Sequence, residues 1–173
     1  MKTFFIATGA VVAMLSAAPA FAQSWMPNNM SYYGTLGYSN IGGDGSGGPD
    51  FGAITGRLGA RYGKYLGLEG EASTGLNNDK SVHVENQYAG YAVGYLPVRP
   101  NADIFARVGY GATVFGSTTP AAIYHGQDDS WNYGGGAQYF FSEHNGVRVD
   151  YTRSDYDHGP DANTWGVSYV RKF

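Results

Sequence analysis

Hydrophobic and polar residues alternate along short stretches of the chain, and Gly, Asn, Asp and Pro separate these stretches. A period of two is typical of β-strands, whose successive side chains point to opposite faces. Nothing after residue 22 keeps an apolar helical period, so the pattern predicts an all-β chain. Eight stretches of about ten residues follow the alternation, at residues 30–39, 50–63, 67–75, 83–96, 102–115, 130–141, 146–156 and 163–173.

The connections between these predicted strands alternate in length. Short turns are expected at residues 64–66, 97–101 and 142–145, and longer connections at residues 40–49, 76–82, 116–129 and 157–162. Strands of this length can cross a bilayer when tilted, and a closed barrel pairs every backbone group there. Outer-membrane barrels have short periplasmic turns and long outer loops. The pattern therefore predicts an eight-stranded antiparallel up-and-down transmembrane β-barrel.

The first 22 residues have the features of a cleaved signal peptide. Met1 and Lys2 give a positive start, an apolar stretch covers residues 4–18, and a small-x-small site ends at Ala22. We expect cleavage between Ala22 and Gln23. This leaves residues 23–173, a length that suits one domain.

Charge and composition exclude several classes of protein. Removal of Lys2 changes the formal net charge from −3 to −4. This charge argues against nucleic acid as a partner and against binding to an anionic surface. The chain contains no cysteine, so it is not a disulfide scaffold.

Charged residues fall on the face of the strands that is expected to point into the barrel. A turn at residues 64–66 places Arg61 opposite Glu69 and Gly59 opposite Glu71, all on one face. The sequence therefore predicts an interior ion-pair network of Arg57, Arg61, Glu69, Glu71, Arg107, Arg148 and Asp150. Such a network is either a polar plug or a gate for ions. An eight-stranded barrel is only just wide enough for its own side chains, which favours the plug.

Aromatic residues fall near the predicted strand ends. Near the short turns lie Tyr62, Tyr65, Tyr95, Tyr139, Phe141 and Phe173, and near the longer connections lie Tyr38, Trp131, Tyr156 and Trp165. Two girdles of this kind are typical of membrane interfaces. Packing within a soluble β-sandwich is the alternative, and it explains the positions less well.

The last stretch, residues 163–173, alternates and ends on an aromatic residue. Trp165, Val167, Tyr169 and Phe173 share one face. In this it resembles the terminal signal that the outer-membrane barrel assembly machinery recognises. Residues 59–71 and 134–151 resemble the small OmpA-like and opacity-type barrel family. This resemblance implies the fold, a Gram-negative outer-membrane location and the assembly route, with functions that range from anchoring to adhesion.

Catalysis is not expected. Some eight-stranded barrels resemble lipid A deacylases or acyltransferases that use a His and a Ser, and His125, Ser130 and Glu143 are the obvious components. However, Glu143 is expected at the other end of the barrel from His125, and no deacylase motif surrounds the histidine.

Metal ions and cofactors are not expected either. The four histidines, which lie near four different connections, are His83, His125, His144 and His158. Asp155, Asp157 and Asp161 lack the ligand spacing of a calcium loop.

The sequence thus predicts a structural or surface-interaction barrel, of an adhesin-like kind, with a plugged interior. A narrow channel for small solutes and a lipid A-modifying enzyme are the alternatives. The expected partners are outer-membrane lipids and lipopolysaccharide, the assembly machinery during biogenesis, and a host or surface ligand at the outer loops. No nucleic acid is expected.

Overall fold

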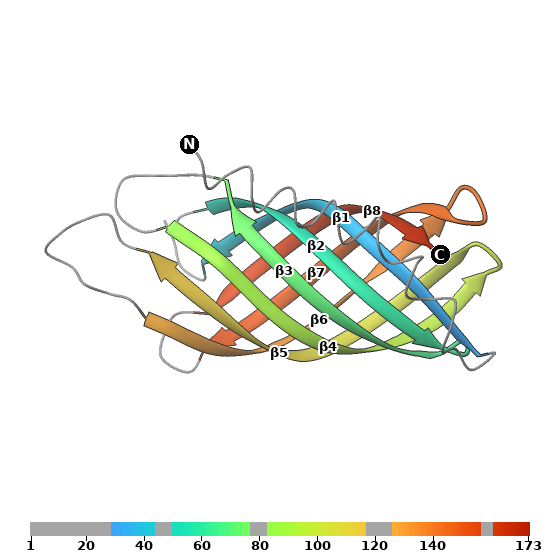
Figure 1. The fold of residues 1–173 in the computed structure, drawn as a ribbon, viewed down its shortest axis with the longest axis horizontal. Coiled ribbons are helices and arrows are strands. Elements are labelled where there is room, and N and C mark those ends of the chain that lie inside the picture. The colour runs from blue at the N-terminus through green and yellow to red at the C-terminus, as the bar shows by residue number, and fades with distance from the viewer. Residues whose placement is uncertain (1–28, 44–49, 77–82, 117–125, 157–160) are drawn as a thin grey trace, which may run out of the picture.

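The chain forms a single closed sheet of eight antiparallel strands (Figure 1). The computed structural model describes residues 29–43, 50–76, 83–116, 126–156 and 161–173. Each strand pairs with the next, and β8 pairs with β1. This confirms the predicted all-β barrel, whereas the expected signal peptide with its cleavage site at Ala22 and Gln23 lies outside the described residues. The strands are β1 (Met30–Gly43), β2 (Asp50–Tyr62), β3 (Leu66–Gly75), β4 (His83–Arg99), β5 (Ala102–Gly116), β6 (Gly126–Phe140), β7 (Asn145–Tyr156) and β8 (Ala162–Lys172).

The two ends of the barrel differ in their connections. At one end, here called the turn end, short turns join β2 to β3, β4 to β5 and β6 to β7 (Figure 1, right). At the other end, the loop end, the connections include residues 44–49, 77–82, 117–125 and 157–160. The chain therefore follows the predicted alternation of connection length.

Three strands extend further than predicted. β1 continues to Gly43, β4 continues to Arg99, and β6 already begins at Gly126. The extensions of β1 and β6 are rich in Gly, Asp and Asn, which suggest loops by composition. Ladder hydrogen bonds use the backbone, however, so such residues remain in a strand wherever a neighbouring strand continues beside them.

Pro97 is accommodated within β4, although the sequence predicts a turn there. The N–H of Tyr95 donates to the carbonyl of Tyr65 at 2.7 Å, on the side of β3. The nitrogen of Pro97 faces the same side, and β3 has already ended, because Leu66 pairs with Gly94. The missing N–H of proline therefore removes no ladder bond.

The turn between β2 and β3 begins one residue earlier than predicted. Gly63 has a φ of 61°, a left-handed conformation that glycine adopts without strain and that interrupts a strand. The turn therefore occupies residues 63–65, and Tyr62 pairs with Leu66.

The predicted pairing of Arg61 with Glu69 is consequently wrong by two residues. Glu69 lies opposite Gly59, and Glu71 lies opposite Arg57. Because the shift is an even number of residues, every side chain keeps its predicted face.

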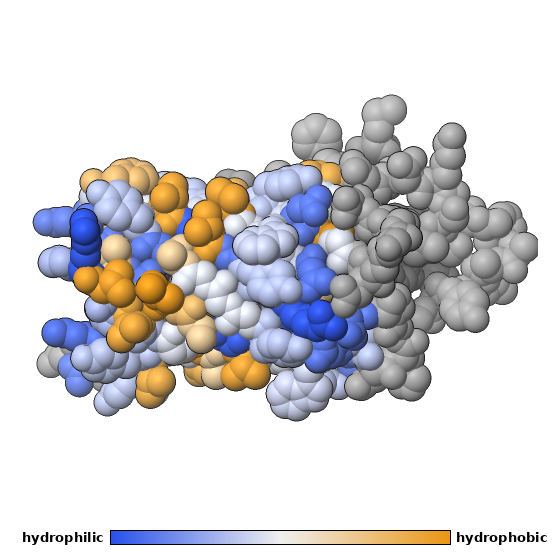
Figure 2. All heavy atoms as spheres, turned by 180° about the vertical axis from the view of Figure 1, so that it is seen from behind, coloured by the Kyte–Doolittle hydropathy of each residue, from blue (hydrophilic) through white to orange (hydrophobic). Residues whose placement is uncertain are grey.

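Side chains alternate between the barrel interior and the outer surface. Val149 is 52% exposed on the outside, whereas its neighbour Arg148 is completely buried inside. The same alternation holds in β2, β3 and β5, as predicted. Figure 2 shows apolar side chains gathered toward the turn end, with hydrophilic residues toward both ends. Among the described residues, no helix has the length and apolar character to span a membrane.

Most of the predicted girdle residues point outward. Exposed rings toward the turn end belong to Tyr62, Tyr65, Tyr139 and Phe141, and those toward the loop end to Tyr38, Trp131 and Trp165. The expected girdle position is wrong for Tyr95 and Tyr156. Tyr95 is buried in the interior, and Tyr156 packs against an interior apolar cluster. Their positions in the alternation turn them inward, and closeness to a strand end does not override it.

Candidate functional site: the barrel interior

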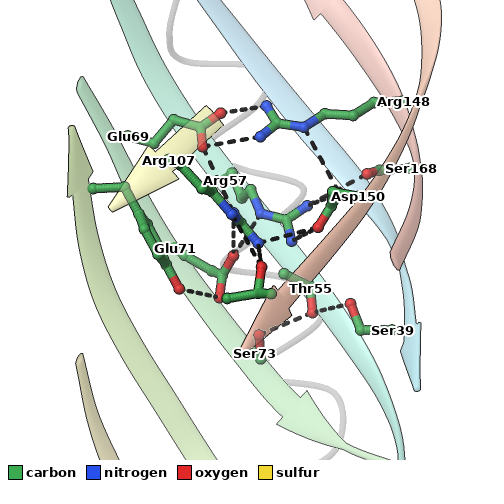
Figure 3. Close-up of polar contacts among 12 residues, drawn as sticks. Ser39, Thr55, Arg57, Glu69, Glu71, Ser73, Arg107, Arg148, Asp150 and Ser168 are labelled. Atoms are coloured by element: carbon green, nitrogen blue, oxygen red, sulfur yellow. Dashed lines mark hydrogen bonds and ion pairs between the residues drawn. The ribbon is translucent and has the colours of Figure 1, made fainter. Parts of the chain in front are cut away.

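Charged side chains from four strands meet in the middle of the barrel (Figure 3). The alternation directs them there, because each occupies an inward position of β2, β3, β5 or β7. We call this group the charged cluster: Arg57, Glu69, Glu71, Arg107, Arg148 and Asp150. The structure thus brings together six of the seven residues of the predicted interior network.

Two carboxylates bridge two arginines at the centre of the charged cluster. Glu71 Oε2 accepts hydrogen bonds from Arg57 Nε at 2.5 Å and from Arg107 Nη1 at 3.0 Å. Asp150 Oδ2 accepts hydrogen bonds from Arg57 Nη2 and Arg107 Nη2, each at 3.1 Å. The four side chains form a ring of ion pairs that joins β2, β3, β5 and β7 across the lumen.

Arg148 and Glu69 form a second pair beside this ring. Arg148 Nη2 donates to Glu69 Oε2 at 3.1 Å, and Arg148 Nη1 also donates to Glu69 Oε1. Two parallel bonds of this kind are the strong geometry for an arginine and a carboxylate. Arg148 Nε lies 3.7 Å from Asp150 Oδ1, and Arg107 Nη1 lies 3.7 Å from Glu69 Oε2, so the pair is joined to the ring.

The charges of the cluster balance. It contains three arginines and three carboxylates, and none of these side chains is more than 7% exposed. A buried charge that loses its partner destabilises a protein by several kcal/mol. Each member of the cluster therefore depends on the others.

Arg61 lies apart from the charged cluster, at the turn end of the interior. Its Nη1 and Nη2 donate to Asp103 Oδ2 and Oδ1 at 2.9 and 3.2 Å, and its Nε donates to the Lys64 carbonyl at 3.1 Å. Gln138 Nε2 also donates to Asp103, at 2.9 Å. The prediction that Arg61 joins the network is wrong, because the register of β2 and β3 carries Arg61 two residues away from Glu69.

Sequence reasoning missed Asp103 and Gln138. The signal for Asp103 was present, because it precedes Arg107 by four residues on β5 and so shares its inward face. Gln138 lies opposite Asp103 on β6. The glycines of β6 hid the alternation of that strand.

Buried apolar side chains lie in the interior between the turn end and the charged cluster. We call them the aromatic layer: Tyr33, Tyr91, Val93, Tyr95, Phe105, Phe140 and Val170. The Tyr95 ring centroid lies 6.5 Å from that of Tyr33 and 6.1 Å from that of Phe105. Tyr33 Oη donates to Glu69 Oε1 at 2.8 Å, and the Arg148 guanidinium lies 3.9 Å from the Phe105 ring centroid. The aromatic layer is therefore in direct contact with the charged cluster.

Inward glycines make room for these rings. A Cβ atom at Gly59 would lie 2.1 Å from Tyr33 Cζ, and one at Gly109 would lie 2.6 Å from Tyr91 Cδ1. Both distances are far shorter than a van der Waals contact. Glycine at these two positions lets a narrow barrel hold large aromatic side chains.

Hydroxyl groups lie on the loop side of the charged cluster. Thr55 Oγ1 is 2.9 Å from both Ser39 Oγ and Ser73 Oγ, which gives a row across three strands (Figure 3). A polar cavity of about 10 Å³ lies beside this row and is also lined by Arg57 and Arg107. A space of this size holds about one water molecule.

The last strand presents apolar side chains to the outside. Trp165, Val167 and Tyr169 are 65%, 61% and 43% exposed, and Phe173 lies half-buried just past the strand. The Phe173 N–H donates to the Tyr32 carbonyl at 2.9 Å. The residues proposed as an assembly signal thus line the closing seam between β8 and β1.

The residues considered for catalysis lie at different places in the barrel. Ser130 is completely buried and donates to Asn132 Oδ1 at 3.1 Å. Glu143 is exposed in the turn between β6 and β7, at the other end. His125 lies outside the described residues.

Within the described ranges, no three acidic or histidine side chains are arranged to hold a metal ion. Asp155 and Asp161, considered for calcium, both pair with Arg153, at 3.1 and 2.6 Å. Asp157, His125 and His158 lie outside the described residues.

A closed eight-stranded barrel with an apolar outer surface and a charged interior has the architecture of a transmembrane β-barrel. The chain belongs to the outer membrane protein β-barrel domain family, whose model matches residues 8–173. It is therefore a barrel of the Gram-negative outer membrane. No curated protein sequence matches the chain.

Solved structures of small outer-membrane barrels are similar to this chain in fold. The attachment invasion locus protein Ail of Yersinia pestis has a TM-score of 0.59 at 17% identity, and the match covers 86% of this chain and all of Ail. The N-terminal barrel of Pseudomonas aeruginosa OprF has a TM-score of 0.66 at 13% identity, covering 84% of this chain and 98% of that one. Neisserial surface protein A has a TM-score of 0.57 at 10% identity, covering 83% and 95%. The family model confirms the predicted barrel family, and these matches show the same small-barrel fold.

Proposed function

We propose that this barrel is a closed scaffold in the outer membrane that presents its loop end to molecules outside the cell. The observation that carries the proposal is the set of interior contacts by which the charged cluster and the aromatic layer join the walls of the barrel. Because an eight-stranded barrel is just wide enough for its own side chains, these two layers act as a plug. The turn end faces the periplasm, as in other barrels with short and long connections.

The loop end carries most of the acidic residues of the chain. By their sequence positions, nine of them lie in the four connections of this end or in the strand ends beside them, together with the cations Lys80 and Arg153: Asp44, Asp50, Asp79, Glu85, Asp128, Asp129, Asp155, Asp157 and Asp161. A surface of one sign raises the local concentration of partners of the opposite sign. The loop end is therefore suited to cationic partners, such as a basic patch on another protein.

This expectation separates the chain from one of its structural neighbours. Ail has been solved in complex with the heparin analogue sucrose octasulfate, a strongly anionic ligand. An acidic loop end repels such a ligand. A shared fold therefore does not bring the same ligand to this chain.

Adhesion of intact cells tests the proposal. Cells that display the barrel are applied to surfaces coated with a lysine-rich peptide or with heparin. We expect the peptide surface to be preferred, and we expect Asp129→Asn/Asp155→Asn/Asp161→Asn to weaken that preference. Glu143→Gln, at the turn end, is the matched control. Equal adhesion by the wild type and the triple variant contradicts the proposal.

A narrow channel for small solutes is the second candidate, supported by the polar cavity beside Arg57 and Arg107. A channel conducts in planar bilayers, and its conductance changes on substitution of either arginine. Because the aromatic layer lies between that cavity and the turn end, we favour the closed scaffold.

A further inference from the structure

Exposed cations gather at the turn end, although the chain as a whole is acidic. We call them the cationic collar: Lys64, Arg99 and Arg171. Lys64 lies in the turn between β2 and β3, Arg99 ends β4, and Arg171 lies near the end of β8. The three charges are thus spread around the rim of the barrel.

No ion pair engages these cations within the part of the chain that the structure describes. Arg61 differs, because Asp103 neutralises it inside the barrel. Among the described residues, Glu143 is the exposed acidic side chain at this rim. The collar therefore presents positive charge to the surroundings.

Each collar residue adjoins an outward apolar side chain. Tyr65 is 61% exposed beside Lys64, Val98 is 51% exposed beside Arg99, and Tyr169 is 43% exposed two residues before Arg171. Interfacial aromatic rings lie at the level of lipid headgroups. Lys and Arg extend their charge into the same zone while their alkyl stems contact the apolar layer. The collar is therefore expected at the height of the headgroup phosphates.

The loop end has the opposite character. Its described acidic residues include Asp129, Asp155 and Asp161, and Arg153 pairs with the last two. Exposed positive charge thus lies at the turn end, and acidic residues lie at the loop end. The expectation from net charge that anionic surfaces are disfavoured applies to the loop end and not to the turn end.

We propose that the cationic collar binds the phosphodiester headgroups of anionic phospholipids in the leaflet on the turn side. The proposal rests on the proposed function only in naming that leaflet as the periplasmic one. Each cation near an anionic surface contributes about fivefold in affinity. Because the three cations are spread around the rim, each contacts its own headgroup, and each site prefers an anionic over a zwitterionic headgroup by about fivefold.

Native mass spectrometry of the purified barrel in mixed lipid and detergent tests this proposal. The probes are phosphatidylglycerol and phosphatidylethanolamine, and the readout is the ratio of the two lipids retained by the barrel. We compare the wild type with Lys64→Gln/Arg99→Gln/Arg171→Gln. The matched control, Lys64→Arg/Arg99→Lys/Arg171→Lys, keeps the charge, and Arg153→Gln removes a cation at the loop end. Heat-dependent mobility in SDS verifies that each variant is folded.

The wild type, the charge-preserving variant and Arg153→Gln are expected to prefer phosphatidylglycerol by about fivefold, and the triple Gln variant is expected to lose that preference. A wild type without preference, or a triple Gln variant that keeps it, overturns the proposal. A triple Gln variant that loses binding to purified peptidoglycan sacculi while its lipid ratio is unchanged also overturns it, in favour of a cell-wall partner.

Orientation is measured separately, so that the two proposals fail in different ways. The chain has no cysteine, so Ser142→Cys places one thiol in the turn between β6 and β7. A maleimide that cannot cross the membrane should label it only after the outer membrane is permeabilised. Labelling in intact cells contradicts the proposed orientation and leaves the lipid ratios of the purified barrel intact.

Discussion

At the scale of single residues, the centre of the barrel depends on charges that neutralise one another. Glu69 contacts Arg148, Arg107 and the Tyr33 hydroxyl, and its side chain is fully buried. Burial makes these contacts strong and makes their loss costly, because no bulk water replaces the missing partner. Substitutions in the charged cluster should therefore have larger effects than substitutions of exposed charges.

Glu69→Gln should lower the free energy of unfolding by about 3–5 kcal/mol, less where interior water reaches Arg148. Glu143→Gln, in the exposed turn, should change it by less than about 0.5 kcal/mol. Urea unfolding in lipid vesicles measures both. Adding Arg148→Met to Glu69→Gln should recover part of the loss, because the unpaired charge is removed. Equal effects of Glu69→Gln and Glu143→Gln would show that the buried pair adds no stability.

Gly59→Ala should destabilise the barrel by about 1–3 kcal/mol, because its Cβ would overlap the Tyr33 ring. Gly70 is the matched control: it lies on the neighbouring strand, and a Cβ there meets no atom within 4 Å. Gly70→Ala should be close to neutral. The same unfolding assay compares them, and a neutral Gly59→Ala would mean that the Tyr33 ring moves aside at no cost.

At the scale of strands and turns, the alternation of hydrophobic and polar residues predicted which side chains point into the barrel. Arg57, Glu71 and Asp150 point inward as expected, because the face of each side chain depends only on its position along its own strand. The register depends on where a turn begins, and the conformation of Gly63 decided that. No pattern of hydrophobicity reports a backbone angle, so the register that separates Arg61 from Glu69 could not be predicted.

Gly63→Ala should cost about 1 kcal/mol or more, because its φ of 61° crowds a Cβ atom. Gly63→Asn should cost less, since asparagine tolerates the left-handed region. Denaturant midpoints of the refolded variants give the comparison. Identical midpoints for the two variants would show that the turn adopts another conformation.

Tyr169→Ser should reduce the amount of folded barrel in the outer membrane, since we propose that the outward face of β8 is the assembly signal. Tyr139→Ser removes a comparably exposed ring from β6 at the same end and serves as the control. The readout is the heat-sensitive band from outer-membrane fractions, normalised to the total protein made. If both variants lower this band equally, the effect belongs to the girdle and not to the terminal strand.

At the scale of the whole molecule, we propose a barrel with a closed body and two ends of opposite charge. The aromatic layer near the turn end and the charged cluster beside it lie one behind the other in the lumen. Ions moving through the barrel would have to pass both layers. This arrangement supports a scaffold whose contacts lie at its ends, with cationic partners at the loop end and lipid headgroups at the turn end.

The current through single barrels in a planar bilayer tests this account most directly. We predict no steady conductance for the wild type in concentrated potassium chloride, because the aromatic layer and the charged cluster fill the lumen. Tyr95→Ala/Phe105→Ala, which opens the aromatic layer, should at most permit brief openings. A steady, reproducible wild-type conductance that changes on substitution of Arg57 or Arg107 would contradict the closed scaffold and make the narrow channel the working model.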